Sequence, residues 1–170
     1  AWREEPDLKM LWAGKLPLHA KFEAVYPELA AERERCTWLG PLEKPELYGV
    51  LQKAVAVVAP SRCDNLPNNV LESLACGVPV IGSAGASIDE LVIAGINGAL
   101  VPIDDSTALA RAMLQAWRGE PPFDGRPIPS LAEDFEPSRA AENLLEYVRL
   151  ARSHSGRRQA TKETVQAVPA

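Results

Sequence analysis

The sequence AVAVVAPSRCDNLPNNVLESLACGVPVIGS, residues 54–83, contains the clearest fold signal of this 170-residue chain. Its first six residues are apolar and rich in valine, which predicts a buried strand, and a second β-rich run follows at 79–82. Between the two, a polar turn leads into a helical pattern that begins near Asn68 and closes at Gly77. Strand, helix and strand in this order are the unit from which parallel sheets are built.

The same alternation continues on both sides of this stretch. Further strands are expected at 8–13, 36–39 and 99–101. Pro45 suits the first turn of a helix, and Leu47, Val50 and Leu51 then form its apolar stripe. We therefore predict an α/β, Rossmann-like fold, with a doubly wound parallel sheet covered by helices on both faces.

Two later helices have recognisable starts. Ser87 and Glu90 have the spacing of a capping box, and Gly95 would end the helix that they open. The next helix is expected after Asp104 or Asp105. Its apolar residues Leu109, Met113, Ala116 and Trp117 lie on one face.

The C-terminal part of the chain changes character. The proline-rich stretch at 120–129 predicts a surface loop, and a last helix is expected at 137–152. Residues 153–170 are mostly polar and show no periodicity, which is typical of a disordered tail. The predicted organisation is therefore one domain at 1–152 followed by a tail at 153–170.

Composition excludes several classes of function. The net charge is −5, so there is no basic footprint of a kind that binds nucleic acid or an anionic membrane. Three cysteines without a CxxC pair favour neither a disulfide scaffold nor a zinc site and suit a reducing compartment. With no apolar run long enough to span a bilayer, we expect a cytoplasmic protein without a transmembrane segment.

The turn at 61–69 is the expected binding site. In an open parallel sheet, ligands lie outside the carboxyl ends of the strands, which is where this turn falls. The helix that starts at Asn68 offers free backbone N–H groups to an anion such as a diphosphate. Two carboxylates, Asp64 and Glu72, flank this helix end. Because carboxylates repel phosphate, their natural partners are the hydroxyls of a sugar and of a ribose, and a nucleotide sugar supplies both.

A purely structural interpretation of the same residues stays open. Asp64 and Asn65 are ordinary turn formers, Asn68 is an ordinary helix cap, and Glu72 is an acid favoured by the helix dipole. On either interpretation Glu72 shares a helix face with Asn68 and Asn69, and we expect Leu71, Leu74 and Ala75 to point the other way, into the core.

Taken whole, PSRCDNLPNNVLESLACGVPVIGS, followed by GASIDEL and GINGALVP, resembles the donor-binding C-terminal domain of family 4 glycosyltransferases with the GT-B fold. That family has an acid, seven residues and a Glu, then Ala-Cys-Gly-x-Pro-Val, which here starts with Asp64 and Glu72. Its later Gly, Glu-Leu and Asn-Gly elements match Gly85, Glu90-Leu91 and Asn97-Gly98, and the resemblance runs over about residues 1–151. Glu90 is explained first by its capping box and is not expected to be catalytic.

The resemblance implies roles for individual residues of this chain. Glu72 would bind the ribose, Asn68 and Asn69 would bind the diphosphate, and the transferred sugar would be bound by Asp64, Asn65 and Leu66. The loop Gly40, Pro41, Leu42 would lie near the base. Asp64 departs from the family's more frequent Glu, and this shorter acid would shift the sugar contact or require a water.

The resemblance also indicates what this sequence lacks. The family's first strand ends in Gly-Arg-Leu, with a Lys shortly after, and this basic pair neutralises the leaving diphosphate. Gly14, Lys15 and Leu16 with Lys21 imitate the pair with one residue too many. We therefore expect the central first strand to lie upstream of Ala1, so that strands 8–13 and 54–59 either pair directly or leave backbone groups exposed, which would make the chain marginally stable.

The function that the resemblance implies is that of a retaining glycosyltransferase. It would transfer a sugar from a nucleotide diphosphate sugar to an acceptor hydroxyl, in bacterial polysaccharide or glycolipid synthesis. The acceptor glycan or glycolipid would bind a missing N-terminal domain, which could also contact the inner membrane. No cofactor or essential metal is expected, since His19 and His154 are the sole histidines and no ligand cluster is present. The chain alone is expected to be inactive.

Two alternatives remain. The chain could be a binding module that holds a nucleotide sugar without catalysis, which the missing basic pair favours. A dinucleotide dehydrogenase domain is the weaker alternative, because no GxGxxG follows a first strand.

Overall fold

The computed structural model describes residues 1–15, 21–32, 34–128, 145–146 and 149. The chain divides into two compact units, Ala1–Ser130 and Leu131–Ala170. Of the second unit, residues 145, 146 and 149 are described, and all three are helical. The rest of the last expected helix, the expected tail at 153–170 and the boundary between them lie outside the described residues.

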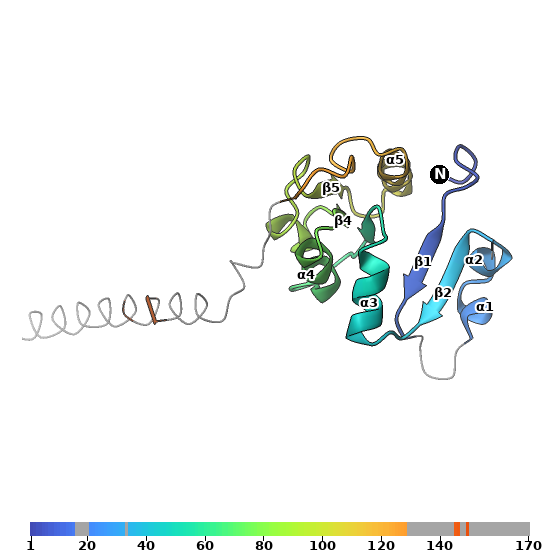
Figure 1. The fold of residues 1–170 in the computed structure, drawn as a ribbon, viewed down its shortest axis with the longest axis horizontal. Helices are drawn as coiled ribbons and strands as arrows, with labels where there is room; N and C mark the ends of the chain where they lie inside the picture. The colour runs from blue at the N-terminus through green and yellow to red at the C-terminus, as the bar shows by residue number, and fades with distance from the viewer. Residues whose placement is uncertain (16–20, 33, 129–144, 147–148, 150–170) are drawn as a thin grey trace, which may run out of the picture. The chain divides into compact units, whose positions relative to one another are not determined.

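The strands of the first unit are parallel and form two sheets (Figure 1). One sheet pairs β1 with β2, and the other has the order β3-β4-β5. All five strands overlap the runs expected from the sequence. Their bounds are β1 Met10–Ala13, β2 Cys36–Gly40, β3 Val57–Ala59, β4 Val80–Ser83 and β5 Gly98–Val101.

Among the described helices, three of eight or more residues follow the sequence expectations, and two short ones were not predicted. The expected ones are α3 Lys44–Leu51, α4 Asn68–Ala75 and α5 Ser106–Trp117, and the short ones are α1 Phe22–Val25 and α2 Pro27–Ala31. Pro45 lies in the first turn of α3. Asp105 caps α5, because its side chain accepts a hydrogen bond from the backbone N–H of Ala108 at 2.8 Å. Both expected helix starts are therefore confirmed.

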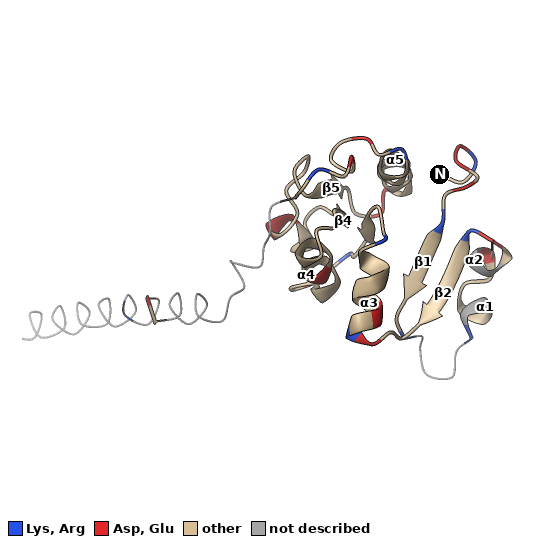
Figure 2. Ribbon diagram, in the orientation of Figure 1, with Lys and Arg blue, Asp and Glu red and all other residues tan. Residues whose placement is uncertain are grey.

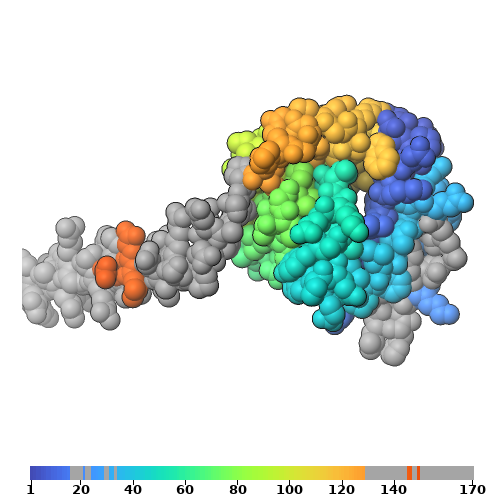
Figure 3. All heavy atoms as spheres, viewed as in Figure 1, coloured from blue at the N-terminus to red at the C-terminus, as the bar shows by residue number. Residues whose placement is uncertain are grey.

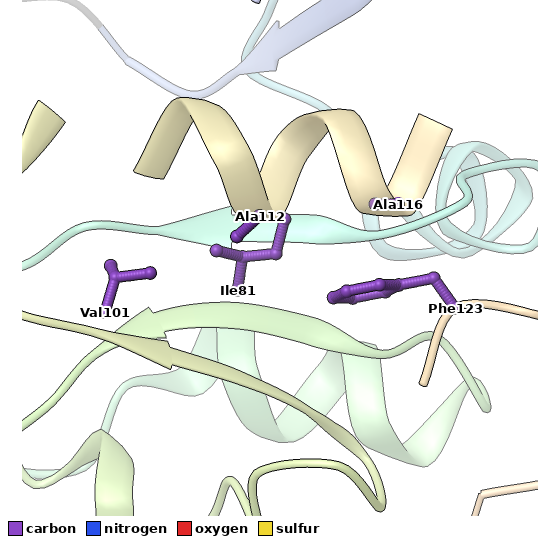
Figure 4. Close-up of a cluster of buried hydrophobic side chains, with 5 residues drawn as sticks. All are labelled: Ile81, Val101, Ala112, Ala116 and Phe123. Atoms are coloured by element: carbon purple, nitrogen blue, oxygen red, sulfur yellow. The ribbon is translucent and has the colours of Figure 1, made fainter. Parts of the chain in front are cut away.

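The core of the first unit lies on both faces of the β3-β4-β5 sheet. Every residue of β4 is buried, although successive side chains of a strand point to opposite faces, so both faces of this strand are covered. On one face, Ile81 packs with Ala112 and Ala116 of α5 and with Phe123, which comes from the loop after α5 (Figure 4). The α/β arrangement with helices on both faces is confirmed.

The expected buried strand at 54–59 is shorter and more exposed than predicted. Only Val57–Ala59 is strand, Val57 and Val58 are half-buried, and Val55 is 52% exposed. The reason is that β3 is an edge strand of its sheet in the described structure. Among the described strands β1 and β3 do not pair, so the sheet does not close between them. The backbone groups of Val58, which point away from β4, therefore face an open edge.

The prediction of a helix at 87–95 is wrong. The structure has a single 3-10 turn, η1 Ile88–Glu90, and Ser87 does not cap it with its side chain. Ser87 lies in the left-handed region at φ 53°, so the capping-box geometry cannot form. Ile88 is fully buried against β4, where a Cβ on Gly82 would come within 2.3 Å of its Cγ2. Packing of one isoleucine onto the strand thus replaces the predicted helix.

Candidate functional site

The loop after β3 leads directly into α4, and the start of this helix is open. Pro67 precedes α4 in an extended conformation and offers no side-chain cap. Its carbonyl accepts hydrogen bonds from the N–H groups of Val70 and Leu71, at 3.0 and 3.2 Å. Within the described part of the chain, the N–H groups of Asn68 and Asn69 have no acceptor. The two asparagines to which the sequence assigned the diphosphate therefore lie at the open start of this helix, where free N–H groups could meet an anion.

The buried side of α4 consists of Val70, Ser73 and Leu74. The expectation that Ala75 faces the core is wrong, since Ala75 is exposed and Leu71 only half-buried. The buried stripe instead repeats at intervals of three and four residues from Val70, because that side of the helix contacts β3 and β4. Asn68 and Asn69 are exposed, and the side chain of Glu72, one turn further on, is 19% exposed.

The residues expected to bind the transferred sugar lie in the loop before the helix. Asp64 is half-buried, and Asn65 and Leu66 are exposed, with 48% of Leu66 accessible. No hydrogen bond to the Asp64 carboxylate is found among the described residues. Both of its oxygens are therefore available as acceptors for a ligand hydroxyl.

The loop expected near the base lies at the end of β2. Gly40 closes the strand, is buried and has a φ of +75°, which a residue with a side chain rarely adopts. Pro41 is exposed and Leu42 is half-buried. Two residues later, Lys44 Nζ donates a hydrogen bond to Glu72 Oε1. This contact brings the end of the expected base-binding loop to the residue expected to bind the ribose.

The partner of Glu72 was not identified from the sequence. Lys44 is the first residue of α3 and the only basic residue of that helix, and Glu72 is the only acid of α4 (Figure 2). The ion pair joins α3 to α4, whose atoms are teal and green in Figure 3. No local spacing rule connects residues that are 28 positions apart. Only the tertiary fold reveals the pair.

A second basic residue lies in the site loop. Arg62 Nε donates to Asp104 Oδ1 at 2.7 Å and so joins the loop after β3 to the turn after β5. Both side chains are mostly exposed. The sequence did not single out Arg62 either. Of the imperfect basic motif, Leu16 lies outside the described residues, as do His19 and His154.

Three further findings on the described residues concern their cysteines, metal binding and membrane spanning. All three cysteines are free, and burial raises the pKa of the Cys36 thiol. In the described ranges no group of three or more His, Cys, Asp or Glu side chains is arranged to hold a metal ion. None of the described helices has both the length and the apolar character needed to cross a bilayer.

Comparison with known proteins identifies the class to which this fold and site belong. The sequence profile of the family described as "Glycosyl transferases group 1" matches residues 1–118. The chain therefore belongs to the glycosyl transferases group 1 family. Its α/β, Rossmann-like fold is the one found in GT-B glycosyltransferases.

Individual relatives agree with this assignment. The D-inositol 3-phosphate glycosyltransferase of Mycolicibacterium gilvum is 30% identical over 112 residues, covering 66% of this chain and 25% of the relative. The chitobiosyldiphosphodolichol beta-mannosyltransferase of Yarrowia lipolytica is 31% identical over 98 residues, covering 56% of this chain and 21% of the relative. The solved structure of sucrose-phosphate synthase from Thermosynechococcus elongatus is similar with a TM-score of 0.59 and 28% identity, covering 68% of this chain and 30% of that protein. This chain thus spans less than a third of the relatives that it matches.

Proposed function

We propose that this chain is the donor-binding part of a retaining glycosyltransferase, which transfers a sugar from a nucleotide diphosphate sugar to an acceptor hydroxyl. One observation carries the proposal. The N–H groups of Asn68 and Asn69 lack acceptors at the uncapped start of α4 in the described structure, with Asp64 three residues before Pro67 and Glu72 one turn into the helix. Open N–H groups suit a diphosphate, and the two carboxylates suit the hydroxyls on either side of it.

In this proposal each group contacts a different part of the donor. Glu72 accepts hydrogen bonds from the ribose hydroxyls, and Asp64, Asn65 and Leu66 contact the transferred sugar. The segment Gly40, Pro41, Leu42 contacts the base, which the proximity of Lys44 to Glu72 supports. In the transfer, the acceptor oxygen forms a bond to the anomeric carbon while the bond from that carbon to the diphosphate breaks. The electron pair leaves with the nucleoside diphosphate, which also gains the acceptor proton.

The rate of such a transfer depends on stabilising the charge that develops on the leaving diphosphate. The amides at the start of α4 would contribute to this, and we propose that the basic residues needed lie largely outside this chain. The acceptor glycan or glycolipid would likewise bind another part of the enzyme, in bacterial polysaccharide or glycolipid synthesis at the cytoplasmic side of the membrane. Transfer by a longer protein that includes these parts, assayed with retention at the anomeric carbon, is the test.

Nucleotide binding itself is testable on the 170-residue chain. Calorimetric titration with UDP, GDP and ADP should show that one of them binds. If this nucleotide binds with the same affinity in EDTA as in Mg²⁺, the result would support the expected independence from a metal. The second candidate function is a binding module without catalysis, which the absence of the family's basic pair from the sequence favours. A longer protein that binds the nucleotide sugar but transfers nothing to any acceptor would favour this second candidate.

A further inference from the structure

The ion pair between Lys44 and Glu72 is unusual in its position. It joins the first residue of α3 to Glu72 in the middle of α4. Most of the Lys44 side chain is exposed, at 63%, whereas only 19% of the Glu72 side chain is. Glu72 is therefore the less hydrated partner, and the contact from Lys44 matters more to the carboxylate than to the ammonium group.

The ammonium group supplies the charge that this carboxylate needs. The hydrogen bond to Glu72 raises the pKa of Lys44 above its ordinary value, so Lys44 is charged at neutral pH. A lone carboxylate near the start of α4 would repel a diphosphate bound there. A neighbouring cation offsets this repulsion, because the two charges together present little net field to an approaching anion.

The geometry also leaves Glu72 able to bind a ligand. The bond from Lys44 is made to Oε1, and among the described residues no donor contacts Oε2. A carboxylate has acceptor sites on both oxygens, so Lys44 can fix the orientation of the group while Oε2 accepts a hydrogen bond from a ligand hydroxyl. Holding an acceptor in place before the ligand arrives reduces the entropy that binding costs.

We propose that Lys44 is a positioning residue of the donor site, which orients the Glu72 carboxylate and neutralises it so that a nucleoside diphosphate can bind beside it. This inference rests on the proposed function. It adds to that function a residue from a different helix that acts through Glu72. It also explains why the segment after β2 is attached to α4 at the place where base and ribose would meet.

A purely structural pair would behave differently. Exposed ion pairs stabilise proteins only slightly, so a tether between α3 and α4 would change stability a little and nucleotide affinity hardly at all. A lysine that contacted the diphosphate directly would lower affinity independently of Glu72. The three roles are separated by asking whether the effect of Lys44 requires the Glu72 carboxylate.

The test is a double-mutant cycle on the 170-residue chain, with the tightest-binding of UDP, GDP and ADP as the probe. Lys44→Met should weaken binding about tenfold, which is the size expected for a charge-assisted contact. In a Glu72→Gln background the same substitution should change affinity by less than about twofold. Lys44→Arg, which keeps charge and donors, should restore most of the affinity. Lys53→Met is the matched control, because Lys53 is exposed and no ion pair of its side chain is found in the described structure.

The outcomes separate this inference from the proposed function. If Glu72→Gln weakens binding but Lys44→Met does not, the role of Lys44 is wrong and the donor site stands. A tenfold loss that persists in the Glu72→Gln background would also overturn the inference, since Lys44 would then act on the ligand directly. If the unmodified chain binds none of the three nucleotides, the proposed function fails, and the inference fails with it. Circular dichroism of each variant checks that the fold is retained.

Discussion

Asn97 Oδ1 accepts a hydrogen bond from the backbone N–H of Ile93 at 2.6 Å, and its Nδ2 donates to the Leu91 carbonyl at 3.0 Å. The side chain is 1% exposed and closes the loop that leads into β5. Asn97 belongs to the Asn-Gly element shared with the glycosyltransferase family. In this chain that element has a structural explanation, because the buried Asn97 side chain supplies partners to the backbone N–H of Ile93 and to the buried C=O of Leu91.

Asn97→Ala should therefore destabilise the fold. The substitution removes both hydrogen bonds and leaves the part-buried N–H of Ile93 and the buried C=O of Leu91 without these partners, so we expect a loss of about 2–4 kcal/mol in the free energy of unfolding. Urea denaturation measures it. Gln115→Ala, an exposed change in α5, serves as the control and should stay within about 0.5 kcal/mol. A change equally small for Asn97→Ala would contradict this account of the loop.

Two glycines should respond to alanine in opposite directions. A Cβ on Gly98 would come within 2.0 Å of the Val80 carbonyl oxygen. Gly98→Ala should therefore lower the free energy of unfolding by at least about 1–3 kcal/mol, because β4 and β5 must move apart. Gly49 lies inside α3 with nothing within 4 Å of the added Cβ. Gly49→Ala should thus stabilise the protein by about 0.5–1 kcal/mol. Thermal unfolding of both variants would show midpoints on either side of the unmodified chain, and shifts of the same sign would contradict the packing described.

Asp124 should titrate at an unusually low pH. The Arg126 side chain, with Nε at 2.7 Å from Oδ1, lowers the Asp124 pKa from 3.8 to about 2. Because the pKa is depressed in the folded state, the contribution of this pair is present above about pH 4 and is lost as the pH falls toward 2. Carboxyl-detected NMR titration of Asp124 measures this, and Arg126→Gln should return the midpoint toward 3.8. A midpoint near 3.8 in the unmodified protein would show that the pair does not form in solution.

Asp64→Ala should separate sugar binding from nucleotide binding. If Asp64 accepts hydroxyls of the transferred sugar, the variant should bind the nucleotide sugar about tenfold to a hundredfold more weakly and the bare nucleotide almost normally. Calorimetry with the nucleotide that binds and with its hexose derivative gives both values. Asp7→Ala, a change at an exposed acid near the N-terminus, is the control. Equal losses for the two ligands would rule out the assignment of Asp64 to the sugar.

The sequence was sufficient for the strands and the main helices because their signals are local. Apolar runs located all five described strands, and Pro45 and Asp105 marked the starts of α3 and α5. The failures depend on contacts between distant residues. Ser87 has the spacing of a helix cap, but packing of Ile88 against β4 places it in the left-handed region instead.

The residues of the candidate site also divide into those placed by local signals and those placed by contacts between distant residues. The placement of Asn68 at the start of α4 and of Glu72 one turn later follows from helix signals alone. The orientation of α4, with Ala75 exposed, depends on which side contacts the sheet and could not be derived from one helix. Lys44 was missed for the same reason, because its contact with Glu72 exists only once the tertiary fold brings the two side chains together.

Glu72, which we propose binds the ribose of a nucleoside diphosphate, is the residue whose replacement is the sharpest test of the donor site. Calorimetric titration of the 170-residue chain with UDP, GDP and ADP identifies the nucleotide that binds. Glu72→Gln should lower the affinity for this nucleotide by at least about tenfold, as expected when a charged acceptor is lost. Glu28→Gln in α2, an exposed acid, should leave the affinity unchanged. Unchanged affinity in a folded Glu72→Gln variant would contradict the account.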